Sequence, residues 1–316
     1  MAAKKIISVI GATGSQGGGL VRAILNDPES DYSVRALTRN VNSDKVRELV
    51  KLGAEVVAVD LDDPESVKRG FDKSFGVYCV TFYWAHFSPE KELAHAWTMA
   101  EAAQYSGAEH VIWSTLEDTR KWIPLGDNRM PTLQEKYKVP HFDAKGEADH
   151  FFEESGVPTT YLIPSFYWEN MIYFGMGPKK DENGILTLTF PMGDKKLAGI
   201  AAEDIGKCAY GIFKAGRRYI GKKVGIAGDH LTGSEMAREL GKALGQDVRY
   251  NDVPPEVYRG FGFPGADDLG NMFQFYRDFE KDCLALRNLE VSRALNPTLM
   301  DFTSWLARYK DRIPIA

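Results

Sequence analysis

Residues 4–25, KKIISVIGATGSQGGGLVRAIL, join three patterns in one short stretch. An apolar run predicts a buried strand, a glycine-rich turn follows it, and apolar residues at helical spacing then predict a helix. Glycine permits a tight turn and the close approach of a ligand, and the first amides of a helix attract an anion. The stretch therefore predicts a cradle for the pyrophosphate of a dinucleotide. The alternative is a glycine-rich loop that binds no ligand.

The residues expected to contact the phosphates lie in the turn and in the first positions of the helix. They are Gly11, Thr13, Gly14, Ser15, Gln16 and Gly17.

Length, composition and charge limit the class of protein. The chain has 316 residues, of which 44% are hydrophobic and 26% charged, as in soluble globular proteins. A net charge of −5 without a basic cluster argues against nucleic acid as a general partner. No apolar stretch is long enough to span a membrane, and the first strand begins too early for a signal peptide, so we expect a cytoplasmic protein. The scattered cysteines Cys79, Cys208 and Cys283 have no metal-ligand spacing, so we expect buried or incidental thiols and no metal site.

Strands and helices alternate after the first helix. Strands are predicted at Tyr32–Thr38, Glu55–Val59, Gly76–Phe82, Glu109–Ser114 and Thr159–Ile163, and helices at Ser43–Leu52, from Asp63, at about Glu90–Ser106 and at about His141–Ser155. This alternation predicts an α/β fold with a doubly wound parallel sheet, the NAD(P)-binding Rossmann fold. Ligands of such a sheet bind beyond the carboxyl ends of its strands.

The rest of the chain is less regular. We expect an NADP-binding Rossmann domain at residues 1–160, with later strands from about 159–163 and 197–227. A smaller, interleaved α/β C-terminal lobe is expected at about 165–196 and 228–316, with a hairpin around Asn183-Gly184 and two helical patterns in the last fifty residues. The polar stretch between Asp118 and Pro140 is predicted to be a functional cover or a mobile loop.

The end of the second strand indicates which dinucleotide is bound. An NAD site has a carboxylate there, whereas this strand ends in Leu37-Thr38-Arg39-Asn40, where Arg39 and Asn40 meet the position of a ribose 2′-phosphate. Lys45 is a possible second cation. The sequence therefore favours NADP (as NADPH when reduced) over NAD. The alternative for Arg39 is a solvated loop charge.

The ends of the next strands are expected to flank the rest of the cofactor. Asp60 and Leu61 follow the third strand and are predicted to lie beside the adenine. Thr81, Phe82 and Tyr83 end the fourth and are predicted to flank the nicotinamide. Packing of Phe82 and Tyr83 without a cofactor contact is the alternative.

Two positions on the helix from His141 could carry chemistry. Short-chain dehydrogenases place an acidic tyrosine four residues before a lysine; this chain has His141 and Lys145. Lys145 is expected to bind the nicotinamide ribose, and His141 to donate a proton or simply to start the helix. Ser114 ends the fifth strand, where this fold usually places a hydroxyl, or caps the following loop. A nicotinamide wall is predicted at Tyr167, Trp168, Glu169 and Asn170, with core packing as the alternative for the first two.

The chain resembles the NmrA-like family of atypical short-chain dehydrogenase relatives. The motifs that carry the likeness are Gly11–Gly18, Leu37–Asn40, His141–Glu147, Tyr167–Asn170, Gly262–Ala266 with Asn271–Phe273, and Leu295–Pro297. The resemblance implies NADP held by the residues named above. It also implies a redox-state regulator that acts through protein partners, with exchange between monomer and homodimer. The loop at Asp118–Pro140 and extra residues around Phe279–Leu289 depart from the regulators.

Two functions follow from these observations. The first is an NADP(H)-binding redox sensor with weak or no turnover, because His141 replaces the usual tyrosine. The second is an NADPH-dependent reductase of a small carbonyl, enone or quinone substrate. In the second, Lys145 would act with His141 or with a tyrosine of the cleft as proton donor.

Overall fold

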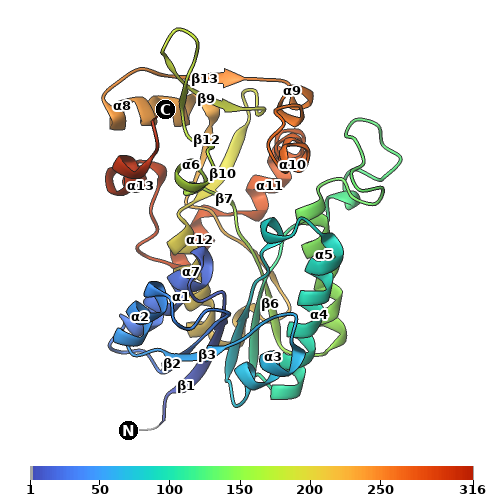
Figure 1. Cartoon of the computed structure of the whole chain (residues 1–316), viewed down its shortest axis with the longest axis vertical. Helices are drawn as coiled ribbons and strands as arrows, with labels where there is room; N and C mark the ends of the chain where they lie inside the picture. Colours follow the sequence, from blue (N-terminus) through green and yellow to red (C-terminus); the bar gives the residue numbers. More distant parts are fainter. Residues whose placement is uncertain (1–2, 316) are drawn as a thin grey trace.

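The computed structural model describes residues 3–315, and a seven-stranded sheet forms its centre (Figure 1). Its strand order is β3-β2-β1-β4-β5-β6-β11, and all neighbours are parallel. The strands are β1 (Lys5–Ile10), β2 (Tyr32–Thr38), β3 (Glu55–Ala58), β4 (Gly76–Cys79), β5 (His110–Ser114), β6 (Thr159–Ile163) and β11 (Lys223–Gly225). The order reverses between β1 and β4, so the doubly wound Rossmann-type sheet is confirmed.

Helices cover both faces of this sheet (Figure 1). One face carries α1 (Ser15–Leu25), α2 (Asp44–Lys51) and α7 (Ala202–Lys214), and the other α3 (Pro64–Phe71), α4 (Pro89–Ser106) and α5 (Pro140–Glu154). Each face has its own apolar core, as expected for a parallel sheet whose strands are buried on both sides. No helix in residues 3–315 combines the length and the apolar character needed to cross a membrane.

Helices α1 and α7 touch backbone to backbone. A Cβ atom on Gly206 would lie 2.0 Å from the Leu20 amide nitrogen, and one on Gly19 would lie 2.6 Å from the Glu203 carbonyl oxygen. Side chains at these positions would push the helices apart. The glycines after the turn therefore fix the position of α1 against a helix from much later in the chain.

The C-terminal lobe lies above the carboxyl edge of the sheet in Figure 1. It contains two small sheets with the orders β12-β10-β7 and β13-β9-β8. Their strands are β7 (Phe166–Tyr167), β8 (Lys179–Lys180), β9 (Leu186–Phe190), β10 (Lys196–Ile200), β12 (Asp229–Thr232) and β13 (Val248–Asp252). The helices of the lobe are α6 (Asn170–Tyr173), α8 (Gly233–Leu244), α9 (Pro255–Arg259), α10 (Ala266–Asp278), α11 (Glu280–Leu286), α12 (Leu289–Leu295) and α13 (Phe302–Tyr309). Across residues 3–315, 3₁₀ turns are found at η1 (Tyr83–Ala85), η2 (Thr119–Lys121), η3 (Gly216–Tyr219) and η4 (Lys310–Arg312).

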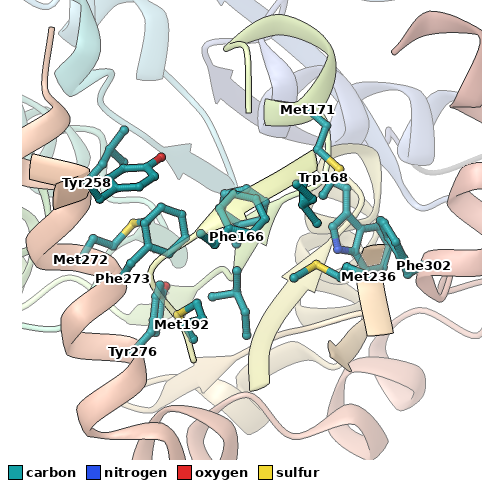
Figure 2. Close-up of a cluster of buried hydrophobic side chains, with 14 of the residues drawn as sticks. Phe166, Trp168, Met171, Met192, Met236, Tyr258, Met272, Phe273, Tyr276 and Phe302 are labelled. Atoms are coloured by element: carbon teal, nitrogen blue, oxygen red, sulfur yellow. The ribbon is translucent and has the colours of Figure 1, made fainter. Parts of the chain in front are cut away.

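Aromatic and methionine side chains fill the core of this lobe. Figure 2 shows Trp168 beside Phe302, and Tyr258 beside Met272 and Phe273. The ring centroids of Trp168 and Phe302 are 5.3 Å apart, a usual separation for packed aromatic pairs. The lobe therefore has a hydrophobic core separate from the two cores of the central sheet.

Several boundaries differ from the sequence-based expectations. The hairpin around Asn183-Gly184 is present, since β8 and β9 pair antiparallel across it. Strand β10, within the range 197–227 assigned to the large sheet, instead pairs with β12 and β7. From Ala266 to Ile315 the structure has four α-helices rather than two, because α10 ends at Asp278 and the Asn288 side chain caps a new helix, α12. Strand β4 ends at Cys79, before the segment that turns into η1.

The loop between Asp118 and Pro140 is a packed cover. Lys138 is buried, and its ammonium donates to the Asp127 and Met130 carbonyl oxygens at 2.8 and 2.7 Å. Helix α10 also holds the loop, because the Gln274 amide donates to the Arg129 carbonyl oxygen at 2.7 Å. The polar sequence of this loop thus serves hydrogen bonds that fasten it to the C-terminal lobe.

A buried ion pair joins the end of β5 to the C-terminal helices. Arg287 and Glu117 form a two-pronged pair, with Nη2 2.9 Å from Oε2, and Arg287 Nε donates to the Pro164 carbonyl oxygen at 3.0 Å. The Glu117 carboxylate holds the pKa of Arg287 above its usual value despite burial. Both side chains are nearly inaccessible, so each charge depends on the other.

Replacing Arg287 with Met should therefore leave Glu117 buried without a counter-ion. We expect the free energy of unfolding to fall by about 3–5 kcal/mol, measured by urea denaturation. Arg293→Met, on the exposed side of α12, is the matched control and should change it by less than about 0.5 kcal/mol. Equal urea midpoints for Arg287→Met and the wild type would contradict this role.

Candidate functional site

The glycine turn at the end of β1 is open toward the carboxyl edge of the sheet. Gly11 has φ +65°, and the Gly14 amide donates to its carbonyl oxygen at 2.8 Å. A Cβ on Gly17 would lie 2.5 Å from that same oxygen, so only glycine allows the turn to close. No side chain caps α1, and Gly14 and Ser15 are exposed. The first amides of α1 are thus free for an anion, which fits the pyrophosphate cradle predicted at this turn.

Two cations lie beside this turn. Arg39 is exposed after β2, and the Lys45 ammonium, on α2, donates to the Thr13 carbonyl oxygen at 3.4 Å. Among residues 3–315, no carboxylate forms an ion pair with either cation. Asn40 is exposed beside Arg39 and accepts a hydrogen bond from the Asn42 amide. The donor set suits a phosphate group, as predicted for the 2′-phosphate of NADP.

Asp60 and Leu61 follow β3 at the same edge of the sheet. Asp60 is exposed, its carboxylate accepts the Asp62 amide at 3.1 Å, and Leu61 is half-buried. Their place beyond the strand end agrees with the region predicted for the adenine.

A polar network joins the glycine turn to the neighbouring strands. The Gln16 amide nitrogen donates to the Tyr167 hydroxyl at 2.5 Å, and its amide oxygen accepts the hydroxyls of Ser114, at 2.7 Å, and Tyr78. Burial raises the pKa values of Tyr78 and Tyr167, so both phenols are neutral. The network places Tyr167 at the carboxyl edge of the sheet, beside Gln16. Tyr78 was not foreseen, because β4 reads as an ordinary apolar strand.

Lys145 pairs with a buried carboxylate from α4. Its ammonium lies 3.2 Å from Glu92 Oε2 and also donates to the Thr81 hydroxyl. Glu92 is 1% exposed, and Thr81 in turn donates to it. The structure thus brings the predicted residues Thr81 and Lys145 together around a third residue that sequence reasoning missed. One signal was available, since Glu92 shares a helix face with Ala96, Met99 and Ala103, where an acidic residue needs a partner.

His86 faces the other oxygen of the same carboxylate. Its Nδ1 accepts the Ser88 amide at 3.1 Å, so the proton of the neutral ring is on Nε2. That nitrogen lies 3.8 Å from Glu92 Oε1, and neither atom has a hydrogen-bond partner among the described residues. Burial lowers the pKa of His86, which favours the neutral ring. Lys145 is therefore the cation that balances Glu92.

His141 is linked to the C-terminal lobe. Its Nδ1 lies 2.6 Å from Asp268 Oδ1 on α10, and its backbone amide donates to Oδ2 of the same carboxylate at 3.2 Å. The ring packs against Tyr83 and Trp84, at centroid distances of 5.9 and 4.7 Å. Sequence reasoning missed Asp268. His141 occupies the helix position where short-chain dehydrogenases carry their acidic tyrosine. Here the side chain at this position connects α5 with α10.

The remaining predicted residues have different surroundings. Phe82 is 56% exposed at the end of β4, whereas Tyr83 is buried against its aromatic neighbours. Trp168 is 1% exposed and packs in the core of the lobe. Glu169 accepts the Ala202 amide and the Trp305 indole, and its burial raises its pKa.

Trp168 and Glu169 thus have packing roles away from the glycine turn. For Trp168, this is the core-packing alternative. Asn170 is half-buried at the start of α6.

Residues 3–315 contain no group of three or more His, Cys, Asp or Glu side chains that could hold a metal ion. Cys79, Cys208 and Cys283 are buried free thiols.

Known proteins share both the sequence pattern and the fold. The chain is 28% identical over 289 residues to the NmrA-like family domain-containing oxidoreductase FrzB of a Cladobotryum species, covering 85% of this chain and 83% of that protein. A crystal structure of NmrA, a negative transcriptional regulator, superposes with a TM-score of 0.79 and 21% identity, covering 96% of this chain and 95% of that one. NmrA has also been solved in complex with NAD and with NADP.

Triphenylmethane reductase from Citrobacter sp., solved with NADP(H), superposes with a TM-score of 0.73 and 17% identity over 96% of this chain and 99% of that one. At such identities the structural matches establish the fold. The model of the NmrA-like family matches residues 3–306, in agreement with the resemblance carried by the motifs. This chain belongs to the NmrA-like family.

Proposed function

We propose that this protein binds NADP(H) and acts as a sensor of its redox state, with weak or no turnover. We infer binding from one observation. The first amides of α1 are free at the glycine turn, and Arg39 and Lys45 lie beside that turn. A nicotinamide dinucleotide would place its pyrophosphate on the turn and its 2′-phosphate near the two cations. Solved complexes of NmrA with NAD and with NADP, and of triphenylmethane reductase with NADP(H), support a nicotinamide dinucleotide at this turn.

The nicotinamide end would lie beside Lys145. The ammonium is held by Glu92 and Thr81, so it is positioned as a donor toward a ribose hydroxyl. Phe82, exposed at the end of β4, would flank the ring.

The sensing role rests on the contact between His141 and Asp268. Lys145 and His141 lie on one helix, α5, while Asp268 belongs to α10 of the lobe. Any preference of the cofactor for one position of α5 would therefore reach α10 through a buried hydrogen bond. A ligand shifts such an equilibrium only by its difference in affinity for the two arrangements. A protein partner or a second copy of the chain would respond to the changed position of α10 in the C-terminal lobe.

A reductase is the second candidate, favoured by the hydroxyl network around Gln16. NADPH, when bound, supplies a hydride. The neutral Tyr167 hydroxyl would then supply a proton to the substrate oxygen, with Gln16 holding the phenol in place. Relatives named oxidoreductases support this alternative, and its substrate would be a small carbonyl, enone or quinone.

Arg39 distinguishes NADPH from NADH in this proposal. Arg39→Ala should weaken NADPH binding about tenfold to a hundredfold, because a hydrogen bond between charged groups is lost, and should leave NADH binding unchanged. Calorimetric titration of both cofactors measures this. Arg47→Ala, an exposed arginine of α2 paired with Asp44, is the matched control. An equal loss of affinity for NADPH and NADH would contradict the assignment of Arg39 to the 2′-phosphate.

The coupling is tested by hydrogen exchange of the full chain. Saturating NADPH should slow amide exchange in α10 and in the loop at 122–139, because both are fastened to α5. His141→Gln, which removes the imidazole contact with Asp268 but keeps a polar side chain, should lose the protection in α10 while NADPH still binds. If α10 is protected equally in both proteins, the contact between His141 and Asp268 does not transmit the signal.

Turnover separates the two candidates. A sensor should bind NADPH tightly and consume it slowly or not at all with a panel of carbonyls, enones and quinones. If one compound is reduced at ordinary enzymatic rates, Tyr167→Phe should lower kcat about 10²- to 10⁴-fold and leave the Kd for NADPH unchanged. An unchanged kcat in this variant would exclude Tyr167 as the proton donor.

A further inference from the structure

A cavity of about 520 Å³ lies in the C-terminal lobe, outside the cofactor site described above. It is enclosed by the segment after α6, by β8 and β9, and by α9 with the loop that follows it. Its volume falls in the range of sites for small organic molecules. The residues that line it are Phe174, Gly175, Met176, Gly177, Lys179, Thr187, Thr189, Tyr258, Phe261, Phe263 and Pro264.

Aromatic rings form much of the lining. Phe174, Phe261 and Phe263 are 56, 45 and 39% exposed, which is costly for side chains of this size unless something covers them. The Tyr258 ring lies 5.0 Å from that of Phe261 and 5.9 Å from that of Phe263, so the last two are gathered on one anchored ring. A flat apolar molecule would bury these faces.

Two polar groups in the lining have no partner in the described residues. Tyr258 is 4% exposed, and its hydroxyl makes no hydrogen bond with residues 3–315. Burial raises the pKa of this phenol, so it stays a neutral donor. The Lys179 ammonium is exposed on β8 and forms no ion pair within the same residues. An unpaired donor and an unpaired cation at an apolar cavity together select an anionic oxygen.

The threonines of β9 already have partners. The Thr187 hydroxyl donates to the Lys179 carbonyl oxygen at 3.1 Å, so its proton is used. The Thr189 hydroxyl accepts the Asn251 side-chain amide at 3.2 Å and keeps its own proton as a further donor. Lys179 and Tyr258 are the lining side chains whose polar groups have no partner among residues 3–315.

The cavity also adjoins the segments expected to flank the nicotinamide. A Cβ on Gly265, just past the cavity wall, would lie 2.8 Å from the Trp84 ring and 3.3 Å from the Phe87 ring. On the other side, Phe174 directly follows α6, which begins at Asn170. A ligand in this cavity would contact residues next to both of these segments. It would leave the glycine turn free.

We propose that this cavity binds a planar aromatic molecule that carries an anionic oxygen, such as an aryl carboxylate. The rings of Phe174, Phe261 and Phe263 cover its faces, and Lys179 and Tyr258 bind the oxygen. This second site goes beyond the proposed NADP(H) sensing and does not depend on it.

The test is calorimetric titration of the full chain with 2-naphthoate, and with the neutral 2-naphthalenemethanol as a matched probe, each with and without saturating NADPH. We expect saturable binding of one 2-naphthoate per chain, and weaker binding of the alcohol. Lys179→Gln should weaken 2-naphthoate binding about three- to tenfold and leave the alcohol unaffected, as for an accessible charge pair. Tyr258→Phe should weaken 2-naphthoate binding by a similar factor.

Lys180→Gln is the control, because Lys180 is the next residue on β8, is also exposed and lies outside the cavity lining. Absence of saturation with 2-naphthoate would overturn the proposal, and so would equal effects of the two lysine variants. Circular dichroism of each variant checks that it is folded. Failure of NADPH binding with normal 2-naphthoate binding would remove the proposed function and leave this site standing.

Discussion

Close backbone contact at glycine is the constraint on which the site depends. Gly17 lets the turn after β1 close on the Gly11 carbonyl oxygen, and Gly19 with Gly206 lets α1 rest directly on α7. The two contacts lie on successive parts of one short helix. Together they set both the direction of its free amides and their distance from the sheet. A methyl group on Gly17 would open the turn, and one on Gly19 or Gly206 would push α1 away from α7.

The second organising feature is the set of buried polar pairs between the central fold and the C-terminal lobe. Glu117 with Arg287, and His141 with Asp268, each pair a residue near the sheet edge with one from the lobe. Such pairs give little net stability once desolvation is counted, but they tolerate few alternative arrangements. The lobe is therefore held in a defined position above the sheet edge. This position puts the aromatic cavity next to the segments predicted to flank the nicotinamide.

The sequence was sufficient for most of the central fold, because its signals are local. Apolar strands, the glycine turn and capping residues such as Asp63 and Ser88 can each be read within a few residues. What could not be predicted depends on distant partners. Asp268 is more than a hundred residues from His141, and Glu92 meets Lys145 only after two helices pack. The position of β10 likewise depends on pairing with β12, so its local pattern could not say which sheet it joins.

The site predictions show the same contrast between local signals and distant partners. The turn residues, Arg39 and Lys145 lie at the sheet edge, as fold topology requires. Trp168 was grouped with its neighbour Tyr167, although successive residues of an extended chain point to opposite sides. Tyr167 therefore meets Gln16, while Trp168 enters the lobe core.

The burial of all three thiols has a consequence for the kind of signal this protein could receive. Cys79, Cys208 and Cys283 lie within the folded interior, and burial raises the pKa of each thiol. Peroxides and disulfides react with the accessible thiolate, which these side chains do not offer. Oxidants would therefore not act on the protein through these three thiols. A sensor built this way would respond to the supply of reducing equivalents through the nucleotide it binds, rather than through oxidation of its cysteines.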